Sequence, residues 1–237
     1  SDDKIHTYYD TSGSNPYGAV NDRVYRDTNA WYHIVWAVDA ANTTHRIWVN
    51  GVEETIAAGR SPPNYSYGMN RAGTVQKWGE PAWGAGAEFQ GCLAEFVHLD
   101  GQYLTHTSFG EFKEGIWVPK EISGLTFGTN GFHLDFSNSG DLGNDVSGNN
   151  IDLSTNDIAS TDQILDTPTN NFANFSVLNS DSNSTLYEGG LRATMGGGGN
   201  YDQVRSDFGL SSGKWYWEVY LEARGYIPAI GVMAGYT

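Results

Sequence analysis

Cysteine, basic residues and long hydrophobic runs are all scarce in this chain. Its 237 residues include one cysteine, Cys92, so no disulfide can form within the chain and a disulfide-stapled scaffold is excluded. Cys92 stands in a strand-like run, which predicts a buried structural thiol. No apolar run approaches the roughly 20 residues of a membrane span, and no signal peptide opens the sequence. We therefore expect no insertion into a membrane.

Positive charge is also in short supply. Lys and Arg number 13 against 28 Asp and Glu, which gives a formal net charge of −15. A phosphate backbone or an anionic lipid surface would be repelled by this charge, so nucleic acid is not an expected partner. Neutral sugars, cations and basic proteins remain as possible partners.

The residues that are abundant indicate a β protein. Aromatic residues make up 14% of the chain, and 30 glycines suit short strands that are joined by tight turns. The segment Trp31–Ala40 is apolar on both faces, with Trp36 and Val38 on one and Val35 and Ala37 on the other, which predicts a central, covered strand. The chain returns through 46–49 and reverses again at Asn50-Gly51, a type I′ hairpin signal. These strands predict an all-β, antiparallel fold.

Composition divides the chain into three parts. Residues 1–120 carry most of the strand signals, and residues 121–184 read as a connector rich in Asn, Ser and Gly. Between 121 and 190 there are ten acidic residues and no Lys or Arg. Residues 185–237 begin a second sheet system. Within it, Lys214–Glu222 alternates between apolar and polar side chains and predicts a half-buried strand.

Several motifs resemble known β-sandwich families. WYHIVWAVD, RIWVNG and GCLAEFVHLDG follow in the order seen in the laminin-G/concanavalin-A-like lectin module, and SSGKWYWEVYLE is similar to the start of a SPRY domain. The resemblance implies a jelly-roll antiparallel β-sandwich over 1–120, with its opening strands missing, and a partial SPRY-like β-sandwich over 185–237. The order of these segments is similar to that of tail-fibre or other structural proteins of marine phages.

The loop between 59 and 86 holds the candidate sugar-binding residues. Sugar recognition uses aromatic faces for the ring and planar amides for its hydroxyls, and long loops on β scaffolds often carry binding. The loop supplies both kinds of side chain, while some of its aromatics would equally serve to plug the sandwich edge. The candidates are Asn64, Tyr65, Tyr67, Asn70, Trp78 and Trp83.

Catalytic and metal chemistry have weaker signals. Glycoside hydrolysis needs two carboxylates that flank the scissile bond; Glu95 and Asp100 are the nearest pair, and Asp100-Gly101 is better explained as a turn. No histidine pair has metal-ligand spacing, and His33 and His98 lie in strand runs as expected structural residues. We expect neither an enzyme nor a cofactor.

Calcium remains an open alternative in the acidic segment. Asp135 to Asp141 places oxygen-bearing side chains at alternate positions with a glycine at the sixth, as an EF-hand loop does. The twelfth position is Val146, where a bidentate glutamate is required. A site at Asp135, Asp141 or Asp145 therefore competes with the reading of these residues as turn-forming aspartates.

The function expected from the sequence is adhesion. The chain would be a phage virion surface protein, such as a tail fibre, spike or decoration protein, present in many copies and binding host-surface glycan through its loops. One alternative is a purely structural module that cements neighbouring virion subunits. A second alternative is a glycan depolymerase.

Overall fold

The computed structural model describes most of the chain outside residues 57–88. The described residues are 3–9, 17–27, 30–39, 41–42, 44–56, 89, 91–170, 172–176, 179–196, 202–206, 209, 212–223 and 229–232. The chain divides into two compact units, the first comprising Ser1–Gln163 with Thr167–Thr169 and the second Ile164–Asp166 with Asn170–Thr237. The connector expected over 121–184 is thus shared between the two units.

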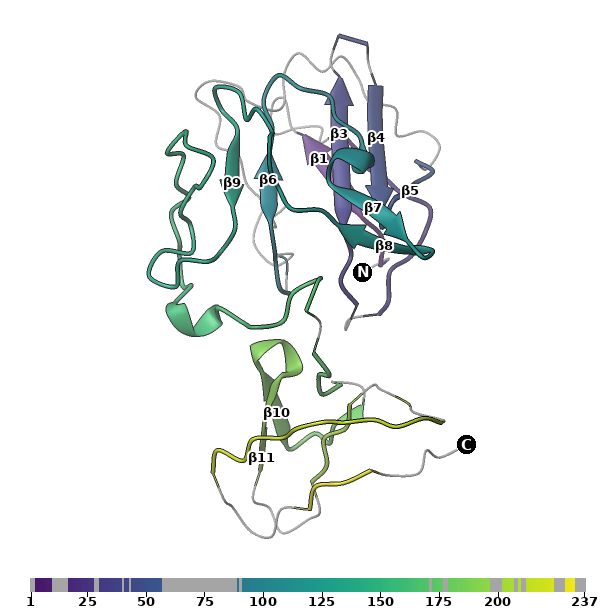
Figure 1. Ribbon diagram of the computed structural model, residues 1–237, viewed down its shortest axis with the longest axis vertical. Helices are drawn as coiled ribbons and strands as arrows, with labels where there is room; N and C mark the ends of the chain where they lie inside the picture. Colours follow the sequence, from purple (N-terminus) through teal and green to yellow (C-terminus); the bar gives the residue numbers. More distant parts are fainter. Residues whose placement is uncertain are drawn as a thin grey trace. The chain divides into compact units, whose positions relative to one another are not determined.

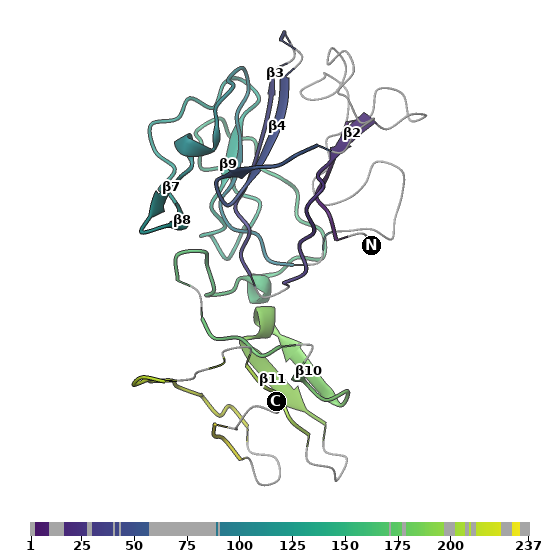
Figure 2. The same ribbon diagram turned by 90° about the vertical axis from the view of Figure 1, so that its right-hand side faces the viewer.

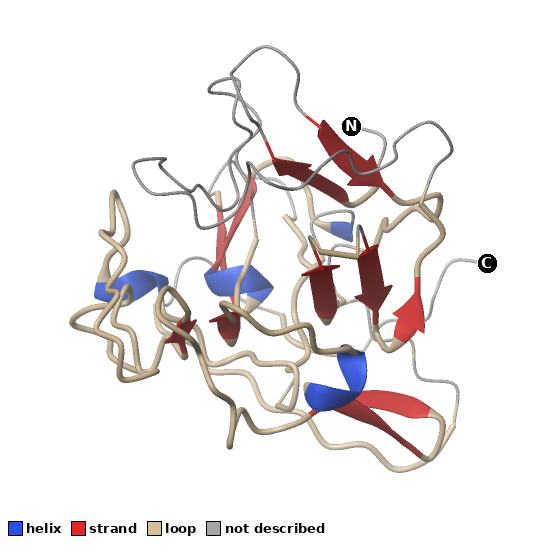
Figure 3. Cartoon of the chain, turned by 90° about the horizontal axis from the view of Figure 1, so that it is seen from above, coloured by secondary structure: helices blue, strands red, loops and turns tan. Residues whose placement is uncertain are grey.

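Short antiparallel strands make up most of the regular secondary structure of the described residues, and loops join them (Figures 1 and 3). The helical elements among them are short 3₁₀ turns, which include η1 (His106–Ser108), η2 (Ser160–Asp162) and η4 (Glu188–Gly190). No helix in the described part of the chain is long and apolar enough to cross a bilayer. The strands are β1 (His6–Tyr9), β2 (Tyr17–Val20), β3 (Ile34–Asp39), β4 (Thr44–Val49), β5 (Val52–Glu53), β6 (Phe96–His98), β7 (Gly110–Lys113), β8 (Ile116–Pro119), β9 (Phe132–Leu134), β10 (Ser184–Tyr187) and β11 (Arg192–Met195).

The sheet β3-β4-β5 forms the centre of the first unit. All six residues of β3 pair with β4, from Ile34 with Val49 to Asp39 with Thr44. Asn50 and Gly51 join β4 to β5 with φ values of 49° and 75°, the positive values that a type I′ turn requires at both positions. The predicted hairpin is therefore confirmed.

The central strand is β4 and not the strand predicted from the longest apolar run. Among the described residues the sheet order places β3 at an edge. Three successive residues of β4, Ile47, Trp48 and Val49, are at most 2% exposed, so β4 is covered on both faces. Burial of consecutive residues, rather than the length of an apolar run, thus marks the centre of this sheet.

Two apolar clusters cover the two faces of the sheet. Ile47 and Val49 pack with Trp36 and with Tyr25 from the N-terminal segment. Val35, Ala37 and Trp48 pack on the other face, against Tyr103 and Phe109. Figure 2 shows β3 and β4 between β2 on one side and the β7–β8 hairpin on the other. The face assignment predicted from alternation is confirmed.

The remaining sheets of the described residues are two-stranded. They pair β1 with β2, β6 with β9 and β7 with β8 in the first unit, and β10 with β11 in the second, all antiparallel. An all-β antiparallel fold is therefore observed. The packing of these sheets into a jelly-roll or SPRY-like sandwich stays a prediction.

Two further sequence predictions are wrong. Lys214–Glu222 is not a strand, and Trp215 and Tyr216, which would lie on opposite faces, are 64% and 83% exposed. Alternation favours a strand only where a neighbour supplies hydrogen bonds and covers the apolar face, and no described segment pairs with this one. Cys92, expected to be buried in a strand run, is exposed and lies before the strand of that region, which begins at Phe96.

Candidate functional site

The six residues predicted to bind sugar all lie outside the described residues. They are Asn64, Tyr65, Tyr67, Asn70, Trp78 and Trp83. Their proposed role stays a prediction. The candidate site described below comes instead from side chains around β5.

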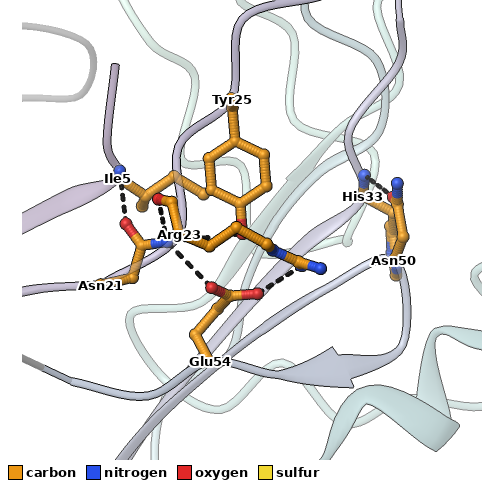
Figure 4. A network of polar contacts seen from close by, with 7 residues as sticks. All are labelled: Ile5, Asn21, Arg23, Tyr25, His33, Asn50 and Glu54. Carbon is orange, nitrogen blue, oxygen red and sulfur yellow. Dashed lines mark hydrogen bonds and ion pairs between the residues drawn. The ribbon is translucent and has the colours of Figure 1, made fainter. Parts of the chain in front are cut away.

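A buried polar network joins the segment after β2 to the residue after β5 (Figure 4). Asn21 is 0% exposed, and its amide nitrogen donates to Glu54 Oε2 at 2.9 Å and to the carbonyl of Arg23 at 2.7 Å. Its amide oxygen accepts from the backbone N–H of Ile5 at 2.8 Å. Because burial of an amide costs free energy unless it is hydrogen-bonded, these contacts fix the geometry of the network.

Arg23 is the charged partner of the buried carboxylate. Its Nη2 forms an ion pair with Glu54 Oε1, and the Glu54 side chain is only 3% exposed whereas the Arg23 side chain is 47% exposed. The guanidinium also donates from Nε to the Tyr25 hydroxyl at 3.1 Å and lies 5.2 Å from the centre of that ring. Burial raises the pKa of Tyr25 to about 12, so its phenol stays neutral at physiological pH. Arg23 is thereby held on two sides with its outer part in solvent.

An open hollow of about 240 Å³ lies beside this network. Its walls offer hydrogen-bond donors from the guanidinium, acceptors from carboxylates and one exposed aliphatic side chain. Glu53 pairs with Arg46 at 3.3 Å, which holds its carboxylate at the surface. The lining residues are Asp22, Arg23, Val52, Glu53, Glu54 and Thr55.

The charge of the hollow limits what it can bind. Three of the lining residues carry carboxylates, Asp22, Glu53 and Glu54, whereas the guanidinium groups near them are those of Arg23 and of Arg46, which pairs with Glu53. The local charge is negative, so an anionic ligand would be repelled. A neutral molecule with several hydroxyl groups matches the mixture of donors and acceptors, and Val52, at 48% exposed, offers a small apolar contact.

Sequence reasoning missed this site although a weak signal was present. Asn21, Arg23 and Tyr25 alternate in the sequence, a spacing that would place their side chains on one side of an extended segment. Glu54 lies 33 residues from Asn21, and no local pattern connects the two. The alternation indicates that these three side chains lie together, but it does not identify Glu54 as their partner.

The two carboxylates weighed for hydrolysis have separate partners. Glu95 Oε2 lies 2.6 Å from His133 Nε2. Asp100 Oδ2 accepts from the backbone N–H of Asn130 at 3.2 Å and from its side-chain amide at 2.8 Å. Each carboxylate thus fixes a different loop, and nothing in their described contacts favours a catalytic pair.

The three aspartates considered as calcium ligands accept hydrogen bonds within local turns. Asp135 accepts from the backbone and hydroxyl of Ser137, and Asp141 accepts from the backbone of Gly143. Asp145 is buried and accepts from its surroundings through four hydrogen bonds, two of which come from Ser147. Within the described ranges, no group of three or more His, Cys, Asp or Glu side chains is placed to hold a metal ion.

Two histidines, His33 and His106, lie next to Trp117. His33 accepts a hydrogen bond from the Trp117 indole at 2.8 Å, and the ring of His106 lies 5.4 Å from that of Trp117. Burial lowers the pKa of His33, and the neighbouring His106 lowers it further. Burial lowers the pKa of His98 as well.

Comparison with known proteins adds no relative. A scan against protein-family models, a search of curated proteins and a search of solved structures each found no match to this chain. The resemblance to laminin-G and SPRY modules therefore stays a prediction from the sequence motifs.

Proposed function

We propose that this protein is a phage virion surface adhesion protein that binds host-surface glycan. It would be a tail fibre, spike or decoration protein, carried in many copies on the particle. Its finer architecture would be a laminin-G/concanavalin-A-like sandwich followed by a SPRY-like one. The motif order of the sequence and the antiparallel all-β scaffold support this proposal.

The arrangement of Arg23 at the hollow is the observation that carries the binding proposal. Glu54 holds one edge of the guanidinium and the Tyr25 ring lies beneath it, so little side-chain freedom remains to be lost on binding. Carboxylates of Asp22 and Glu53 lie on the same hollow as acceptors. This mixture suits one sugar residue of a neutral glycan, which presents hydroxyls that both donate and accept.

Weak binding at a single open hollow is compatible with adhesion. A hollow of about 240 Å³ buries little of a glycan, so affinity per site would be low. Many linked copies on one particle raise the effective affinity by orders of magnitude without any new contact. Multivalency thus supplies the strength that the single site lacks.

A glycan array that displays neutral and acidic glycans tests this proposal. The wild-type chain should bind neutral glycans and not acidic ones. Arg23→Lys keeps a positive charge beside Glu54 but removes the planar donor set, and it should weaken binding at least tenfold. Glu121→Gln, at an exposed residue that does not line the hollow, serves as the control and should bind as the wild type does.

The predicted loop is tested in the same array. Tyr65→Ala and Trp83→Ala remove aromatic faces from the loop. Loss of binding in these variants with Arg23→Lys unaffected would move the sugar site from the hollow to the loop. Absence of binding by the wild type to every glycan would contradict adhesion to glycan altogether.

One structural feature favours the cementing alternative. Trp215, Trp217 and Leu221 of the second unit are 64%, 48% and 49% exposed, an unusual density of large apolar side chains in solvent. A neighbouring virion subunit would cover such a segment. Retention of the chain on purified particles after Trp215→Ser and Trp217→Ser, with normal glycan binding, would contradict this alternative.

A further inference from the structure

Trp117 of β8 links the β7–β8 hairpin to the residue that precedes β3, and Phe109, directly before β7, also packs on the central sheet. The Trp117 indole Nε1 donates to His33 Nδ1 at 2.8 Å, and the two rings are stacked with centroids 5.8 Å apart. His33 immediately precedes β3, and its backbone N–H is held by the side chain of Asn50 at 2.8 Å. The acceptor is therefore fixed on the sheet while the donor belongs to the hairpin.

Two glycines leave space for the indole of Trp117. A Cβ atom at Gly51 would lie 2.1 Å from Trp117 Cε3, and one at Gly110 would lie 2.3 Å from Trp117 Cζ2. Both distances are far below van der Waals contact, so only glycine leaves room for the indole at these positions. The indole thus fits against the turn that joins β4 to β5.

A second imidazole lies close to the same indole. The ring of His106 in η1 is 5.4 Å from that of Trp117 and 5.3 Å from that of Trp48. Its Nδ1 is buried without a hydrogen-bond partner among the described residues. The imidazoles of His33 and His106, from two separate segments of the chain, therefore both lie next to Trp117.

The hydrogen bond dictates the protonation state of His33. Nδ1 accepts from an N–H group, so it carries no proton while the bond exists. A proton added at Nδ1 would point at the indole N–H, and the bond would be lost. A charge on His33 would also lie against the ring of Trp117 and close to His106. Burial and the proximity of His106 lower the pKa of His33 in agreement with this geometry.

The charged side chains of the hairpin do not stabilise a positive charge on His33. Glu111 of β7 pairs with Lys113 at 3.1 Å and with Lys120 at 3.9 Å, all on exposed parts of the hairpin and its end. The turn residues 50 and 51 carry no charge. Within the part of the chain that the structure describes, His106 is thus the titratable group that acts on His33.

We propose that Trp117 and His33 form a proton-sensitive latch that holds the β7–β8 hairpin on the β3-β4-β5 sheet and releases it on acidification. This device does not depend on the proposed glycan site. It would give a surface protein a local conformational change at acidic pH while the central sheet stays folded.

Nuclear magnetic resonance of the full chain, with ¹⁵N-labelled tryptophan, tests the latch. The indole N–H signal of Trp117, assigned with Trp117→Phe, should shift or broaden below neutral pH. Amide hydrogen exchange in β7 and β8, corrected for its intrinsic pH dependence, should increase at least tenfold in the same range. Exchange in β3 and β4 should change little.

Two variants make the test specific. His33→Asn keeps an oxygen acceptor near the position of Nδ1 but does not titrate, so the acid transition should disappear while the hairpin stays docked. His106→Asn removes the neighbouring imidazole, whose electrostatic interaction lowers the pKa of His33, so the transition should move to higher pH. An unchanged transition in His33→Asn, no transition in the wild type, or simultaneous opening of β3 and β4 would overturn the proposal.

Discussion

Asn21 and Glu54, which lie 33 residues apart in the chain, are joined by a buried hydrogen bond of 2.9 Å. This contact links the segment after β2 to the end of the central sheet. It also orders the carboxylate that holds Arg23 at the edge of the hollow. Structural support and the candidate binding site therefore share one pair of residues.

Removal of the Asn21 amide should destabilise the first unit strongly. Asn21→Ala leaves the Ile5 N–H and one oxygen of Glu54 without their partner, at a cost of about 2–4 kcal/mol in the free energy of unfolding. Urea denaturation followed by circular dichroism measures the change. Asn156→Ala, at an exposed position, should cost less than about 0.5 kcal/mol. Equal effects in the two variants would mean that the network contributes little.

Asp145 should behave as a structural acceptor and not as a calcium ligand. Burial raises its pKa, but hydrogen bonds from the backbones of His133 and Ile151 and from Ser147 outweigh burial and leave the pKa lowered. A lowered pKa contributes stability above the unfolded value near 3.9, which is lost as pH falls through the folded value.

Substitution of Asp145 tests that role. Asp145→Asn removes acceptor capacity and should lower the free energy of unfolding by about 2–3 kcal/mol at neutral pH. Added calcium should leave the melting temperature of the wild type unchanged. A calcium-dependent rise in melting temperature that Asp145→Asn abolishes would contradict the structural reading.

His45 should make stability depend on pH. Its Nε2 accepts from the Trp36 indole at 2.6 Å, and burial lowers its pKa to about 4. Between that value and the unfolded value near 6.5, the unfolded chain binds a proton that the folded chain does not. The free energy of unfolding should therefore fall as pH is lowered from about 6.5 to about 4.

A comparison with His45→Gln isolates this contribution. The wild type should lose about 1–2 kcal/mol more than the variant across that range, a figure reduced to allow for the partial exposure of the ring. Denaturant midpoints measured at several pH values provide the comparison. Parallel curves for the two proteins would show that His45 does not titrate differently in the folded state.

Two tryptophans should differ sharply in their effect on stability. Trp48 is 2% exposed at the centre of the sheet, whereas Trp215 is 64% exposed. Trp48→Ala should cost about 3–5 kcal/mol, and Trp215→Ser should cost less than about 0.5 kcal/mol. Thermal denaturation of both variants checks the order. A large loss in Trp215→Ser would indicate that this side chain is buried in solution.

Local chemistry made part of the fold predictable. Asn50-Gly51 specifies a turn by its own backbone preferences, and alternation places Val35 and Trp36 on opposite faces of β3 wherever that strand pairs. Both predictions needed only residues that are neighbours in sequence. The choice of β4 as the central strand was missed because it depends on which segments cover the sheet.

The features that the sequence did not predict depend on contacts between residues that are distant in the chain. Lys214–Glu222 has the alternation of a strand, but no described segment supplies its hydrogen bonds. The hollow was missed because Arg23 and Glu54 become a site only when the chain brings 21–25 beside β5. The Trp117 to His33 bond likewise spans 84 residues. Long-range pairing of polar groups leaves almost no trace in a single sequence.

The most direct test of the adhesion account is a titration of ¹⁵N-arginine-labelled protein with a neutral oligosaccharide chosen from the array. The side-chain Nε–H signal of Arg23, assigned with Arg23→Lys, should shift in a saturable way and report the same Kd as calorimetry. An acidic oligosaccharide of equal length should leave this signal in place. Binding that leaves the Arg23 signal unmoved, or no binding of any neutral glycan, would contradict the account.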